Sequence, residues 1–243
     1  MTYYSKLEEI KRQCLSTLNR KTDDPQNIRN MKKMLIRVHA NMVFCFESLG
    51  LWGVLEASRL LLTGDYCERK ELIEGDGNFV DDSLSDRYLA QVAEAFASDC
   101  MAGGFSFDLS SVEVLKEPFF SRKLLRLIGI LTSCRLQPNM KCIIFVNRII
   151  TAISLSNILQ NLRLLASWKC HFLVGIHAGQ KSMSRSTMNN ILEKFQSGEV
   201  KCIAEEDALW RKTIVAKYDM DDKGGSPERV QDQMRKACGE RLI

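Results

Sequence analysis

The sequence predicts an α + α/β protein, in which a helical bundle is followed by a partial parallel α/β unit and a poorly ordered tail. Three observations lead to this fold class. Through residues 1–115 the apolar residues recur three or four positions apart, which is the period of an amphipathic helix. Between 116 and 203 short apolar runs alternate with helical stretches, an order typical of parallel strands joined by crossover helices. Residues 204–243 carry nine acidic and eight basic side chains and few apolar ones, which predicts poor order.

Start and stop signals divide the first segment into separate helices. Asp24 and Pro25 are typical of an N-cap followed by a proline at the first helical position. Gly50 and Gly64 are expected to end helices, and an acidic loop is expected over residues 74–82. The apolar stripes are Leu7, Ile10, Cys14 and Leu18; Ile28, Met31, Leu35, Val38, Met42, Phe46 and Leu49; and Leu84, Tyr88, Val92 and Phe96.

The second segment changes its period. Residues 141–147 form a short, largely apolar run that suits a strand buried on both faces. Gly198 closes the last expected helix, and the apolar residues of that helix (Met188, Ile191, Leu192 and Phe195) are expected to face inward. Helices are expected over 119–131, 149–165 and 184–196, and strands over 141–147, 171–177 and 200–203.

Composition narrows the class of protein. The chain has 243 residues, 45% of them hydrophobic and 26% charged, which is ordinary for a globular protein. No stretch is long and apolar enough for a membrane span or a signal peptide, so no membrane association is expected. The nine cysteines form no C-x-x-C pair, which favours reduced, mostly buried thiols in the cytosol or nucleus. The net charge of +4 permits nucleic-acid binding without demonstrating it.

One loop has the ingredients of a phosphate site. Residues 172–182 contain glycine, lysine and serine after an expected strand and before an expected helix, as in a phosphate-binding loop. The spacing is wrong, because Gln180 stands where such a loop needs a glycine. Free backbone donors at the helix start still favour an anion, with lysine and hydroxyl groups holding a phosphate backbone. The alternative is a solvated turn with an ordinary serine cap.

Two further patterns resemble catalytic or metal sites. Glu205, Glu206 and Asp207 follow an expected strand, as the magnesium-binding carboxylates of nucleotide hydrolases do, but no phosphate-binding loop precedes them. Cys170, His171 and His177 lack a fourth metal ligand, so core packing explains them better. The sequence therefore predicts no complete active site.

Several long ungapped stretches resemble plant Dicer-like endoribonucleases, and within that family the Dicer-like four group. They are EVLKEPFFSRKLLRLI (113–128), LQPNMKCIIFVNR (136–148) and WKCHFLVGIHAG (168–179), with KSMSR (181–185) and ILEKF (191–195) beyond them. The resemblance covers most of residues 1–203.

The resemblance implies a domain map. Residues 1–115 are similar to the helical insertion between the two RecA-like lobes of the Dicer helicase, and 116–203 to the start of the second lobe, with 204–243 as a divergent tail. Residues 145–148 fall on helicase motif IV, and 175–184 on the following motif that contacts the RNA backbone; Ala178 departs from an expected serine. The implied RNA-backbone contacts are Asn147, Arg148, Gly179, Lys181, Ser182, Ser184 and Arg185.

The resemblance also implies a biochemical role. The family's function is ATP-dependent processing of double-stranded RNA into small interfering RNA, in RNA silencing. Double-stranded RNA is the implied partner, with double-stranded-RNA-binding proteins docking on the helical insertion. ATP and magnesium are the implied cofactors of the full-length family, and the implied location is the nucleus or the cytoplasm.

The sequence departs from the family after Ile203. The family's motif V (Glu-Glu-Gly-x-Asp-Ile) and its arginine-rich motif VI do not follow, and residues 207–218 resemble plant retroelement reverse transcriptases instead. The chain is therefore expected to be a truncated segment with no catalytic residue, metal site or cofactor site of its own. The alternatives are a non-catalytic module that binds RNA or a partner protein through residues 1–115, and a non-functional gene relic.

Overall fold

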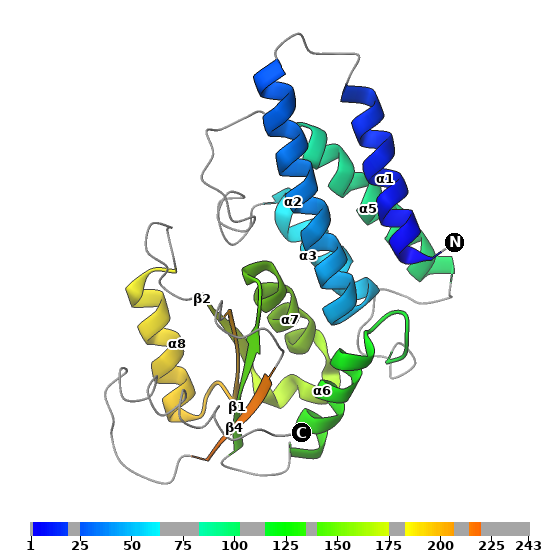
Figure 1. Ribbon diagram of the computed structural model, residues 1–243. Coiled ribbons are helices and arrows are strands. Elements are labelled where there is room, and N and C mark those ends of the chain that lie inside the picture. Colours follow the sequence, from blue (N-terminus) through cyan, green and yellow to red (C-terminus); the bar gives the residue numbers. More distant parts are fainter. Residues whose placement is uncertain are drawn as a thin grey trace. The chain divides into compact units, whose positions relative to one another are not determined.

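The computed structural model divides the chain into two compact units, Met1–Leu124 and Leu125–Ile243 (Figure 1). Each unit is described by itself. The domain boundaries expected from the sequence, near residues 115 and 203, stay predictions. The structure describes residues 2–18, 25–63, 83–102, 115–134, 140–174, 183–206 and 214–219.

The first unit is helical, as the sequence predicts. Its helices are α1 (Tyr3–Leu18), α2 (Pro25–Leu49), α3 (Leu51–Thr63) and α5 (Ser83–Ala102). All three predicted stripes are buried, except that Ile28 and Phe46 are half-buried. Pro25 is the first residue of α2, as expected, whereas Asp24 and Gly64 lie outside the described residues. None of the described helices is long and apolar enough to cross a membrane.

Gly50 joins α2 to α3 at a crowded point. Its φ of +89° lies in the left-handed region that glycine tolerates. The segment before α6 packs directly against it: Leu51 N donates to Pro118 O at 3.1 Å, and Ser121 N donates to Leu49 O at 3.0 Å. A Cβ on Gly50 would lie 2.6 Å from Ser121 N, so only glycine fits here. The glycine therefore ends α2, as predicted, and also admits a distant segment.

The second unit contains a small mixed sheet. Its strands lie in the order β2-β3-β1-β4, with β1, β2 and β3 parallel and β4 antiparallel to β1. The parallel part confirms the predicted α/β arrangement. The elements are α6 (Arg122–Cys134), which begins in the first unit, β1 (Met140–Val146), α7 (Ile149–Asn161), η2 (Arg163–Trp168), β2 (Cys170–Val174), α8 (Arg185–Ser197), β3 (Cys202–Glu206) and β4 (Ile214–Asp219).

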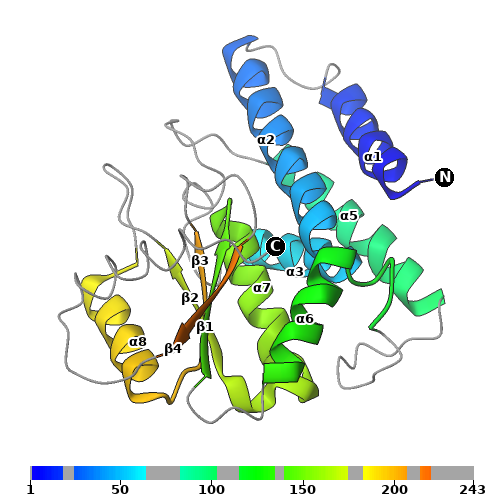
Figure 2. The same cartoon turned by 60° about the horizontal axis from the view of Figure 1, so that its bottom comes forward.

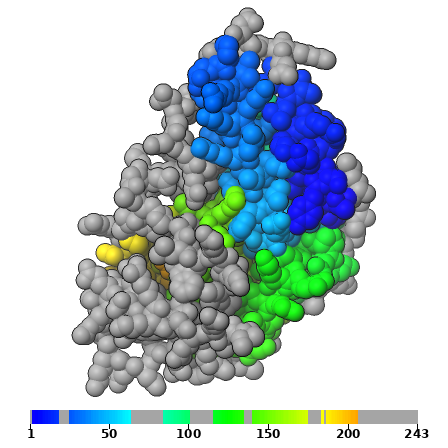
Figure 3. All heavy atoms as spheres, viewed as in Figure 1, coloured from blue at the N-terminus to red at the C-terminus, as the bar shows by residue number. Residues whose placement is uncertain are grey.

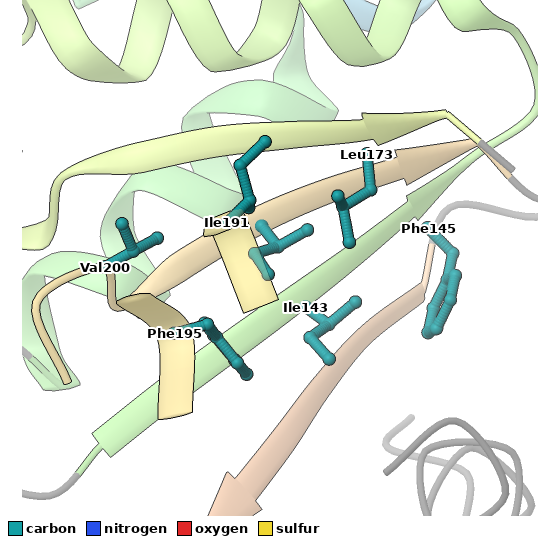
Figure 4. Close-up of a cluster of buried hydrophobic side chains, with 7 residues drawn as sticks. Ile143, Phe145, Leu173, Ile191, Phe195 and Val200 are labelled. Carbon is teal, nitrogen blue, oxygen red and sulfur yellow. The ribbon is translucent and has the colours of Figure 1, made fainter. Parts of the chain in front are cut away.

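Helices cover both faces of the sheet (Figure 2). α7 packs on one face, and its side chains from Ile149 to Leu159 are all buried. α8 covers the other face, where Phe195 and Ile191 meet apolar side chains of the strands (Figure 4). Met188 and Leu192 pack against the same cluster, so the predicted inward face of this helix is confirmed. The buried cluster is Ile143, Phe145, Leu173, Ile191, Phe195, Val200 and Ile203.

Two helices differ from the sequence prediction. The helix expected over 119–131 begins only at Arg122, because Phe119 and Phe120 are buried in a turn before it. The helix expected over 149–165 ends at Asn161 and is followed by the 3-10 helix η2. Apolar periodicity does not resolve such breaks, since the buried pattern continues through them.

The tail also differs from the expectation of poor order after Ile203. β3 continues to Glu206, and Ile214–Asp219 pairs along almost the whole of β1 as β4. The physical reason is that β1 offers a second edge with unpaired backbone groups, which an extended segment satisfies. Residues 207–213 and 220–243 lie outside the described residues.

Candidate nucleic-acid interface

The carboxyl ends of the three parallel strands lie in one row. Val146 of β1 and Val174 of β2 are both in register with Glu206 of β3. Parallel α/β sheets bind ligands at this edge, where strands lead into helix N-termini. Residues 147 and 148, which follow β1 directly, and the start of α8, which follows β2, belong to the same edge. The structure therefore places Asn147 and Arg148 directly after the carboxyl end of β1, and their contact with RNA stays a prediction.

Asn147 and Arg148 connect β1 to α7. Arg148 is the N-cap of α7 in an extended conformation, and no side chain caps the helix. Its carbonyl accepts the first helical hydrogen bonds, from Thr151 N at 3.0 Å and Ala152 N at 3.1 Å. The first turn of α7 contains no acidic residue. Uncapped backbone donors at a helix N-terminus favour an anion.

The side-chain amide of Asn147 adds a second polar group at this edge. Its Oδ1 atom is buried, and no described group hydrogen-bonds to it. Buried amide oxygens normally accept a hydrogen bond, and a hydroxyl group of a bound ligand or a water molecule could donate one to Asn147 Oδ1. Asn147 is thus placed where the resemblance expects an RNA contact.

Ser184 has a structural role. Its hydroxyl accepts a hydrogen bond from Thr187 N at 3.1 Å and lies 2.8 Å from Thr187 Oγ1, so Ser184 is the N-cap of α8. This is the ordinary serine cap that the sequence left open. The residue is exposed to solvent. Gly179, Lys181, Ser182 and the side chain of Arg185 lie outside the described residues.

The structure places Glu205 and Glu206 within β3 rather than after the strand, because β3 extends to Glu206. Glu205 is half-buried and in register with Phe145 and Leu173, while Asp207 lies outside the described residues. Within the described ranges, no group of three or more His, Cys, Asp or Glu residues could hold a metal ion.

Cys170 and His171, two of the metal ligands considered from the sequence, are adjacent residues of β2. Adjacent residues of a β-strand point to opposite faces, so the two side chains lie on opposite sides of β2. Cys170 is buried and His171 half-buried, whereas His177 lies outside the described residues. Core packing remains the better explanation for Cys170.

Sequence reasoning missed a row of three thiols. Cys142, Cys202 and Cys170 lie side by side across β1, β3 and β2, all buried. Hydrogen bonding of the protonated Cys202 thiol with Cys142 and Cys170, together with burial, raises the pKa of Cys202 well above its ordinary value. Protonated, buried thiols are poor nucleophiles and poor metal ligands. The three cysteines therefore act as small, adaptable core side chains between the sheet and α7.

The helical unit contains a polar chain that links three of its helices. The imidazole Nδ1 of His39 on α2 lies 2.9 Å from the hydroxyl of Tyr88 on α5, and its Nε2 lies 3.2 Å from the carboxylate of Glu8 on α1. Nε2–H donates to Glu8, so Nδ1 accepts from the Tyr88 hydroxyl. Burial lowers the pKa of His39, the charge of Lys11 lowers it further, and Glu8 opposes both effects. Neutral His39 is thus the form that the folded helices require.

We expect the stability of the chain to fall on acidification through this histidine. Because the pKa of His39 is lower in the folded state than its ordinary value of about 6.5, the unfolded state binds the extra proton. Its contribution is complete above about pH 6.5 and is lost as the pH falls through the folded-state pKa. Thermal midpoints measured between pH 8 and pH 5 should therefore drop, and His39→Gln should reduce the drop.

His171 provides the matched control for this measurement. Burial and Lys194 lower the pKa of His171 as well, while Glu199 opposes them. The His171→Gln variant should remove a separate part of the pH dependence, and the double variant should remove the contributions of both His39 and His171. An unchanged pH dependence in His39→Gln would contradict the assignment.

Comparison with known proteins identifies homologues of this chain. No protein-family model matches the chain. Dicer homolog 4 of Oryza sativa subsp. japonica, an endoribonuclease, is 40% identical over 224 residues, which are 88% of this chain and 13% of that protein. Dicer homolog 2 of Arabidopsis thaliana is 24% identical over 184 residues, or 75% of this chain and 13% of that protein. Dicer homolog 2a of Oryza sativa subsp. japonica is 26% identical over 208 residues, or 81% of this chain and 14% of that protein.

The similarity extends over most of the chain and is too high to arise by chance. The relatives come from two plant species. The chain spans between 13% and 14% of the length of these relatives. The homologues of this chain are plant Dicer-like endoribonucleases, as the resemblance of its ungapped stretches indicates.

Proposed function

We propose that this chain is a Dicer-like helicase segment of the RNA-silencing pathway that binds the backbone of double-stranded RNA. The observation that carries the proposal is the 40% identity to an endoribonuclease Dicer homolog over 88% of the chain. The parent function is ATP-dependent processing of double-stranded RNA into small interfering RNA. In this proposal ATP and magnesium belong to the full-length family, and the protein acts in the nucleus or the cytoplasm.

The two units take the roles of the helicase insertion and the start of the second RecA-like lobe. The order of parallel strands and the helices on both faces support the second assignment, since an α/β lobe is built this way. The row of strand ends at Val146, Val174 and Glu206 supports ligand binding at that edge.

At this edge of the sheet the chain would bind the RNA backbone and so position the duplex. The N-terminal donors of α7, the Arg148 guanidinium and the Asn147 amide would hold phosphate and ribose oxygens. We include in the proposed RNA-backbone site three further residues near the start of α8, Lys181, Ser182 and Arg185. None of these groups reads a base, so the binding should be independent of sequence.

The test is the affinity of the 243-residue chain for a labelled RNA duplex, measured by fluorescence anisotropy across a range of salt concentrations. Arg148→Ala and Arg185→Ala should each weaken binding roughly 3- to 10-fold on every duplex sequence and reduce the salt slope by about 1. Arg163→Ala is the matched control, because Arg163 is exposed and lies in η2, at the start of β2 rather than at the strand ends.

Two results would contradict the proposed RNA contact. One is binding that does not weaken as salt increases. The other is a loss of affinity in Arg163→Ala that equals the loss in Arg148→Ala. In either case the strand-end edge is not the RNA-backbone site.

A further inference from the structure

α2 carries a row of basic side chains on its solvent face. Arg29, Lys33 and Arg37 are exposed and follow one another at intervals of four residues, so they lie along one side of the helix. Within the described ranges, no carboxylate forms an ion pair with any of them. On α1 and α3, by contrast, basic side chains pair within the helix: Lys11 pairs with Glu8 at 2.7 Å, and Arg59 with Glu56 at 2.9 Å.

This arrangement does not stabilise the helix. Like charges four residues apart repel each other, so Arg29–Lys33 and Lys33–Arg37 are both unfavourable pairs. Arg29 also lies near the N-terminus of α2, where the positive end of the helix dipole disfavours a basic side chain. The basic face is therefore better explained by an anionic partner than by helix stability.

Apolar side chains run along the same face. Ile36 is 55% exposed, and Ala40 and Val43 are half-buried, at the i, i+4 and i+7 positions of a helix seam. Figure 3 shows α2, in mid-blue, reaching the molecular surface along most of its length. A phosphate backbone makes no use of an exposed isoleucine, whereas a second amphipathic helix buries it.

We propose that this face of α2, defined by Arg29, Lys33, Ile36 and Arg37, docks an acidic amphipathic helix of a partner protein. The apolar seam of the partner covers Ile36, Ala40 and Val43, and its flanking glutamates and aspartates face the basic side chains. A basic RNA-binding domain would be repelled by this face. The inference does not rest on the proposed RNA contact, because it concerns the other unit of the chain.

The probe is a synthetic amphipathic peptide of about three heptads with leucine along its seam and glutamate on both flanks. Two control peptides keep the length: one carries lysine on the flanks, and one carries glutamine along the seam. Binding of each labelled peptide to the full chain is measured by fluorescence anisotropy. We expect the glutamate-flanked peptide to bind about tenfold or more tightly than either control.

Matched variants locate the binding face. Lys33→Glu with Arg37→Glu should weaken peptide binding about tenfold or more, and Ile36→Ala should weaken it several-fold, since all three side chains are exposed and not part of the core. The control is Lys123→Glu with Arg126→Glu, an equal charge reversal at exposed positions of α6. Circular dichroism confirms that each variant is folded.

Several outcomes would overturn the proposal. It is wrong if the wild-type chain binds the glutamate-flanked peptide no better than the lysine-flanked one. It is also wrong if the α2 and α6 charge reversals weaken peptide binding equally, or if Ile36→Ala has no effect. If the α2 reversal lowers affinity for duplex RNA but not for the acidic peptide, the face binds nucleic acid instead. Duplex binding that depends on Arg148 tests the strand-end site separately.

Discussion

The Gly50→Ala variant is expected to lose about 3 to 5 kcal/mol of folding free energy from the helical unit. Two physical costs add. The φ of +89° is strained for any residue with a side chain, and the new methyl group would lie 2.6 Å from Ser121 N and 2.7 Å from Phe119 O. These neighbours are backbone atoms, held in place by hydrogen bonds to Leu49 and Trp52, so they cannot move aside cheaply.

Urea unfolding monitored by circular dichroism measures this loss, and Gly129→Ala is the control. Gly129 is an exposed glycine inside α6, and a Cβ there would meet nothing within 4 Å. That substitution should stabilise the chain by roughly 0.5 to 1 kcal/mol, because alanine favours the helix and restricts the unfolded chain. A Gly50→Ala variant as stable as wild type would show that the α2–α3 junction is not packed against residues 118–121.

The Phe195→Ala variant is expected to lose about 3 to 5 kcal/mol of folding free energy from the α/β unit. Phe195 is 1% exposed and lies in the cluster between α8 and the sheet, beside Ile143 and Val200 (Figure 4). Its ring also lies 5.6 Å from the amine of Lys141, which donates to Gln196 O at 2.7 Å near the end of α8. Alanine leaves a cavity and removes this contact.

Chemical denaturation of the full chain, followed by circular dichroism, measures the effect. Ile130→Ala is the control, because Ile130 is 49% exposed on α6 and its truncation should change stability by about 0.5 kcal/mol or less. An equal loss in the two variants would mean that α8 does not pack on the sheet as described.

This packing bears on the candidate interface. α8 is anchored to the sheet mainly through Phe195 and Ile191, and its capped N-terminus at Ser184 belongs to the strand-end edge. A partially detached helix would misplace Ser184 and Arg185 relative to Asn147. We therefore expect Phe195→Ala to weaken duplex binding even where the chain remains folded.

Local sequence patterns were sufficient to predict much of the local structure. The 3.6-residue period identified the buried faces of α1 and α2, because a helix in contact with a core places apolar residues on one side. Ser184 and Gly198 marked the ends of α8, since both have conformational roles that few other residues fulfil. Long ungapped stretches also identified the family, which the 40% identical relative bears out.

The contacts between segments far apart in the chain could not be predicted in this way and became apparent in the folded structure. The position of β3 between β2 and β1, the pairing of β4 with β1, and the thiol row at Cys142, Cys202 and Cys170 all depend on strand order and register. The contacts of Gly50 with residues 118–121 and of His39 with Tyr88 and Glu8 also join positions far apart in the sequence. Periodicity and capping report the environment of one element at a time. Pairing between elements is selected by the packing of the whole core, so no local pattern encodes it.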